Sequence, residues 1–78
     1  MTSIQRTTFE VAPIGRSWSV TRRGFARDST HKTKDAAVKR AVELARDKMP
    51  SELIIQRQDG SIQETRFYGS DPEKLIKL

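Results

Sequence analysis

The sequence contains no cysteine. A chain without thiols has no disulfide framework, no thiol nucleophile and no cysteine-based zinc site. Its 78 residues must therefore be stabilised by the hydrophobic core of one small domain. The lack of cysteine also suits a reducing compartment, so we expect a cytoplasmic protein.

Long apolar runs are missing as well. No stretch approaches the roughly 20 apolar residues that a membrane-spanning helix needs. The first nine residues are mostly polar and include Arg6, so they lack the apolar segment of a secretory signal. We expect no membrane insertion.

The sequence has few residues that could act in catalysis or bind a metal. His31 is the single histidine, so no second imidazole can join it in a metal site or a proton relay, and we expect a residue at a strand end or in a loop. The sequence has no nucleophile elbow and no glycine-rich phosphate loop. No general base lies close in sequence to three serines of the first half: Ser17, Ser19 and Ser29. We expect a protein that is not an enzyme and that has neither cofactor nor metal.

Positive charge is the most informative feature that is present. The net charge is +5, from 15 Lys and Arg against 10 Asp and Glu. Residues 1–34 hold seven basic residues against Glu10 and Asp28, whereas residues 35–78 hold eight of each sign. The excess charge therefore lies in the first half and favours an acidic partner such as nucleic acid, an anionic membrane surface or an acidic protein. The alternative is that the basic surface only keeps the protein soluble.

The clearest predicted element is a helix from about Lys34 to Lys48. Thr33 is in place as its N-cap, and Pro50 ends it because proline disfavours helical geometry in the residue before it. A helical period places seven apolar residues on one face: Ala37, Val38, Ala41, Val42, Leu44, Ala45 and Met49. Because most of these side chains are alanine or valine, the helix can pack closely on a sheet.

Two hairpins flank the predicted helix. In the first, residues 16–22 alternate in polarity as a half-buried strand does, Arg23-Gly24 forms the turn, and residues 25–31 return in a register that the pattern does not fix. In the second, residues 52–58 and 61–68 flank Asp59-Gly60, a strong hairpin signal in which we expect both turn residues to have positive φ.

These elements predict an α+β fold of β-β-α-β-β order, with a mostly antiparallel sheet and the helix on one face. The single domain has its core at about residues 16–72. Residues 1–15 are expected to form an extra edge strand, at about residues 6–12, or a flexible arm. Residues 73–78 form a tail whose apolar side chains cover the sheet edge or mediate self-association: Leu75, Ile76 and Leu78.

The order and spacing of several short motifs resemble a small bacterial family, domain of unknown function 2188. The likeness covers residues 16–72 and rests on Trp18-Ser-Val20, Gly24, Arg27, the segment Thr33-Lys-Asp-Ala-Ala37 with Ala41 and Ala45, Asp59-Gly60-Ser-Ile62, and Tyr68-Gly-Ser-Asp-Pro72. The resemblance implies a fold and no activity.

The first half is also similar to the small AP2-like DNA-binding domains of phage-type integrases, which lay a three-stranded sheet on DNA. The similarity rests on two strands followed by Thr33-Lys-x-x-Ala at the start of a helix. It implies that four arginines contact DNA: Arg16, Arg22, Arg23 and Arg27. A shared packing of hairpin and helix is the alternative explanation.

We therefore expect a non-catalytic nucleic-acid-binding or accessory module that contacts the phosphates of DNA or RNA through its first hairpin. Its contacting residues are predicted to be Arg16, Arg22, Arg23, Arg27, Lys32 and Lys34. Trp18, the only tryptophan, is interpreted as the centre of the core, with base stacking as the alternative. The alternative function is a protein-interaction module that forms a homodimer, or binds an acidic protein, through a sheet edge or the tail.

Overall fold

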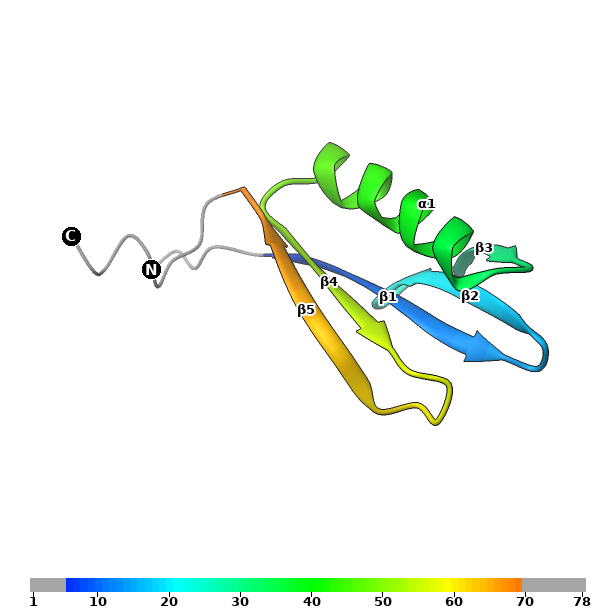
Figure 1. Cartoon of the computed structure of the whole chain (residues 1–78). Helices are drawn as coiled ribbons and strands as arrows, with labels where there is room; N and C mark the ends of the chain where they lie inside the picture. Colours follow the sequence, from blue (N-terminus) through cyan, green and yellow to red (C-terminus); the bar gives the residue numbers. More distant parts are fainter. Residues whose placement is uncertain (1–5, 70–78) are drawn as a thin grey trace.

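A computed structural model describes residues 6–69 as a five-stranded sheet covered on one face by a single helix (Figure 1). The elements follow one another in the order β1 (Thr7–Ile14), β2 (Ser17–Arg22), β3 (Arg27–His31), α1 (Lys34–Asp47), β4 (Ser51–Gln56) and β5 (Ile62–Tyr68). The α+β class with two hairpins around one helix is as predicted. The tail with Leu75, Ile76 and Leu78 lies outside the described residues. Within residues 6–69, no helix has the length and apolar character needed to cross a membrane.

The strands lie in the order β3-β2-β1-β4-β5. Three of the four neighbouring pairs are antiparallel, whereas β1 and β4 are parallel, with Phe9 opposite Leu53. The strand expected at about residues 6–12 is confirmed as β1, but its expected place at an edge is wrong, as is the alternative of a flexible arm for residues 7–14, because β1 is the central strand. The physical reason is that β1 presents Phe9 and Val11 to the core, and both side chains are buried.

The core lies between the sheet and the alanine face of α1. Alternate residues of β1, β2 and β4 point toward the helix and are buried, and they meet three helix alanines: Phe9, Val11, Val20, Leu53, Ile55, Ala37, Ala41 and Ala45. Because the alanine side chains are small, the helix backbone can approach the sheet closely. The larger side chains are supplied by the strands.

Helix α1 begins and ends where the sequence predicts. The Thr33 Oγ1 accepts a hydrogen bond from the backbone N–H of Ala36 at 3.1 Å, which satisfies one of the free donors of the first turn. After Asp47 the chain turns into β4. There the buried Ser51 hydroxyl donates to the Ala45 carbonyl and joins the last helical turn to the sheet.

The turn between β4 and β5 differs from the one expected. Gly60 has a φ of 88°, but no described residue other than glycine has a positive φ, so the expectation for Asp59 is wrong. The backbone N–H of Gly60 donates to the Arg57 carbonyl, and the Arg57 N–H donates to the Ser61 carbonyl. This is a three-residue loop with glycine in the left-handed position. It requires positive φ at one residue only.

The first hairpin has a definite register that the sequence pattern did not fix. Trp18 lies opposite His31 and Val20 opposite Ser29, and a bulge leaves Asp28 without a partner on β2. Trp18 is only partly buried and packs against the edge of the core, so its predicted place at the core centre is wrong. Phe9, on the central strand, is the largest fully buried side chain.

Candidate nucleic-acid interface

The six predicted contact residues do not form one patch. Strands β2 and β3 are antiparallel, so Arg22, Arg23 and Arg27 lie at the turn between them. The other three lie at the opposite end of the hairpin, close to the start of α1: Arg16, Lys32 and Lys34. Arg27 of one group and Lys32 of the other are five residues apart along β3, which at about 3.4 Å per residue separates the two groups by about 17 Å.

Within residues 6–69, Arg23 is the one residue of the six that forms a salt bridge with an acidic residue. Its Nη2 lies 2.5 Å from Oε2 of Glu10 on β1. Glu10 points to the sheet face that α1 leaves uncovered, since its neighbours Phe9 and Val11 point to the helix. The pairing removes Arg23 from the set of free cations.

A groove beside the β2–β3 turn gathers basic residues from three elements. It has a volume of about 470 Å³ and is lined by Phe9, Arg22, Phe25, Ala26, Arg27, Asp28, Leu44 and Lys48. We call it the tip groove. The Arg22 guanidinium lies 4.1 Å from the centre of the Phe25 ring, and this phenylalanine is 61% exposed. Such an arrangement is a cation–π contact at an aromatic surface open to solvent.

Asp28, the acidic residue that lines the tip groove, is paired with an arginine of α1. Asp28 accepts hydrogen bonds from Nε and Nη2 of Arg40 on α1, at 3.1 and 3.4 Å. These hydrogen bonds hold the pKa of the Asp28 carboxyl below its ordinary value, because they stabilise the charged form. The carboxylate charge is thereby balanced, and Arg22, Arg27 and Lys48 give the groove a positive excess.

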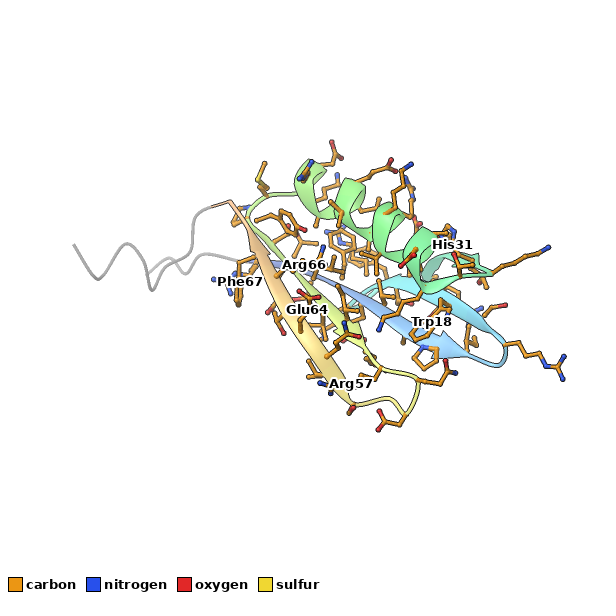
Figure 2. All side chains as sticks on the ribbon, viewed as in Figure 1. Trp18, His31, Arg57, Glu64, Arg66 and Phe67 are labelled. Carbon is orange, nitrogen blue, oxygen red and sulfur yellow. The ribbon has the colours of Figure 1, made fainter. Side chains whose placement is uncertain are left out.

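In the second group of cations, Lys34 contacts Trp18. Lys34, the first residue of α1, places its Nζ 5.1 Å from the centre of the indole ring and donates a hydrogen bond to Gln63 on β5. Figure 2 shows Trp18 beside the N-terminal end of the helix. Arg16 and Lys32 are exposed in the adjoining turns. This end of the hairpin thus carries positive charge next to the positive pole of the helix dipole.

A serine–histidine contact on β3 was not expected. Ser29 and His31 are two residues apart on one strand, so their side chains share a face, and Ser29 Oγ lies 2.8 Å from His31 Nε2. The prediction that Ser29 has no general base nearby is therefore wrong, because the His31 imidazole is within hydrogen-bond distance. Among the described residues, however, no carboxylate forms a hydrogen bond with His31 that would complete a triad. The position of His31 at the end of β3 is as predicted.

Sequence reasoning identified Arg22 and Arg27 and missed two other residues of the tip groove. Phe25 was interpreted as a strand residue, whereas it lies in the turn before β3 and its ring is exposed. Lys48 comes from the far end of α1. Its proximity to the first hairpin is a tertiary effect with no local signal.

The comparisons with known proteins place the chain in a family and go no further. No curated protein and no solved structure matches it. The likeness of the first half to integrase DNA-binding domains therefore stays a prediction. The model of one family matches residues 9–68, from β1 to the last residue of β5. The chain belongs to this family, which is described as an uncharacterized protein conserved in bacteria (DUF2188).

Proposed function

We propose that this protein is a non-catalytic module that binds single-stranded nucleic acid through the tip groove, with additional phosphate contacts along the first hairpin. The observation that carries the proposal is the Phe25 ring, 61% exposed and stacked with Arg22 in a groove that Arg27 and Lys48 also line. An exposed ring next to cations can stack on a base of any sequence while the cations contact its phosphates.

The arrangement of charge supports a flexible strand rather than a duplex laid on the sheet. The uncovered sheet face carries Glu10 and Glu52, of which Glu10 is balanced by Arg23 and Glu52 accepts a hydrogen bond from Thr8. Arg6, 4.9 Å above the Phe67 ring, adds one cation on the β5 side of this face. The five members of the predicted set that no acidic residue pairs within residues 6–69 lie at the two ends of the β2–β3 hairpin, about 17 Å apart, a span that a single strand can follow.

A cytoplasmic location is part of the proposal, because nucleic acid is accessible there and the chain has no cysteine that would need an oxidising compartment.

The test measures binding of a labelled single-stranded oligonucleotide and of the matched duplex at several salt concentrations. Affinity for the single strand is expected to fall with salt, with a slope of about −0.7 on a double-logarithmic plot for each phosphate contact. Arg22→Glu with Arg27→Glu should reduce both affinity and slope. The control Lys39→Glu with Arg46→Glu makes the same charge change on α1, seven residues apart on one exposed face, and should have a much smaller effect.

The contribution of stacking is tested separately. Phe25→Ala should weaken single-strand binding by about 1–3 kcal/mol without changing the salt slope, because stacking involves no counterion release. Phe25→Trp should retain binding. The proposal fails if no complex forms at low salt, or if the control pair on α1 weakens binding as much as the pair in the tip groove.

A further inference from the structure

Within residues 6–69, strand β5 pairs with a neighbour on one edge only, and most of its side chains are exposed. It is the last strand of the sheet, and α1 packs on the other four strands. None of its seven residues is buried, and Ile62 and Phe67 are 58% and 49% exposed. Figure 1 shows β5 beyond the area that the helix covers. A seven-residue free edge of this kind is a template for pairing with another strand.

The sequence of this edge is complementary to itself. In an antiparallel pair of two β5 strands centred on Thr65, Glu64 of each copy lies opposite Arg66 of the other. Both side chains are on the face that looks toward the helix, since they lie opposite Ile55 and Leu53 on β4. Opposite charges directly across an antiparallel pair stabilise it.

The same two residues already contact each other within one chain. Arg66 Nε lies 3.0 Å from Glu64 Oε2, and this contact lowers the pKa of the Glu64 carboxyl. Figure 2 shows the two side chains next to each other on β5, and Phe67 on the other side of the strand. Two copies would bring two such pairs together in a network of four alternating charges.

The other free edge lacks these properties. Each edge strand has one bulge, at Asp28 in β3 and at Gln63 in β5. The bulge leaves three regular residues in β3 after Asp28 and five in β5 after Gln63. Strand β3 also begins with Arg27 and is followed by Lys32, and charge of one sign discourages pairing of edges. An antiparallel pair centred on Ser29 would place Arg27 opposite His31 and would form no pair of opposite charges.

We propose that the protein forms a symmetric homodimer through antiparallel pairing of β5 with β5 of a second copy, centred on Thr65. The two sheets then form one sheet of ten strands, with both helices on the same face. The tip groove lies near the opposite edge of each sheet, so it stays free in the dimer. The dimer is therefore independent of the nucleic-acid proposal, and either can fail without the other.

The oligomeric state of the full chain, measured by light scattering after size exclusion, is the first readout. A mass of twice 8.9 kDa is expected, with dissociation on dilution. Glu64→Arg gives four like charges at the pair and should yield a monomer, as should Arg66→Glu. The double variant E64R/R66E restores opposite charges and should restore the dimer. Circular dichroism verifies that each variant is folded.

The register is tested by a cross-link. The chain has no cysteine, so Thr65→Cys introduces a single thiol on the symmetry axis. Opposed residues in an antiparallel pair have Cα atoms about 4.5–5.5 Å apart, within disulfide range. Oxidation should give a covalent dimer for Thr65→Cys and little for the exposed Thr30→Cys on β3. A monomer at every concentration, or equal cross-linking of both variants, would overturn the proposal.

Discussion

At the residue scale, two hydrogen bonds from Arg40 to Asp28 join the edge strand β3 to the helix. They arise because the bulge turns Asp28 toward α1, where Arg40 also contacts Glu43 at 3.7 Å. The carboxylate is partly exposed, so its energetic contribution is modest. Its dependence on pH, however, has a definite sign.

Asp28→Asn should reduce the free energy of unfolding at pH 7 and should have no effect in strong acid. The Arg40 hydrogen bonds hold the pKa of Asp28 below its ordinary value of 3.8 in the folded protein. Its contribution is therefore fully present above that value and is lost as the pH falls through the lower, folded-state pKa. Urea unfolding of both proteins at a series of pH values from 7 downward measures the difference, which should disappear at acidic pH.

A double-mutant cycle with Arg40→Gln isolates the pair. In that background Asp28→Asn should have almost no effect at pH 7, because its main partner has been removed. An equal effect of Asp28→Asn with and without Arg40 would contradict this account of the carboxylate.

At the scale of the elements, the alanine face of α1 sets the distance between helix and sheet. Ala37, Ala41 and Ala45 are fully buried against strands that carry the larger side chains. The helix can therefore be moved outward only by breaking its contacts with β1, β2 and β4.

Ala41→Leu should destabilise the protein by about 1–3 kcal/mol, because the added side chain has no space between helix and sheet. The matched control is Ala36→Leu on the exposed side of the same helix, which should change stability by less than about 0.5 kcal/mol. Thermal or urea unfolding of the two variants gives the comparison. Equal destabilisation would show that the effect comes from helix propensity and not from packing.

Local signals explain which elements the sequence predicts well. Thr33 and Pro50 define the ends of α1, and Gly60 between two β-prone segments defines the second hairpin. The place of β1 was missed because its parallel pairing with β4 joins Phe9 to Leu53, 44 positions along the chain. No neighbour in sequence indicates that pairing. The division of the basic residues into two groups was missed for a related reason, since it depends on the register of β2 and β3.

At the scale of the whole molecule, the Phe9 side chain on β1 packs between the two neighbouring strands and the helix. Phe9 lies opposite Arg22 on one neighbouring strand and Leu53 on the other, and it is 2% exposed beneath α1. A small domain has about 5–15 kcal/mol of stability in total.

Phe9→Ala should cost about 3–5 kcal/mol and leave much of the protein unfolded. Phe25→Ala is the matched control, because the same substitution at a 61% exposed ring should leave the free energy of unfolding almost unchanged. Urea unfolding followed by circular dichroism measures both. A mild effect at Phe9 would contradict the central position of β1.

The parallel pairing of β1 with β4 also has a consequence for synthesis on the ribosome. Strands β1, β2 and β3 can pair as soon as they emerge, because their connections are short. One edge of β1, next to Phe9 and Val11, has no partner until residues 51–56 have been made. The first three strands therefore carry an open apolar edge until β4 has been made, and the sheet closes only then.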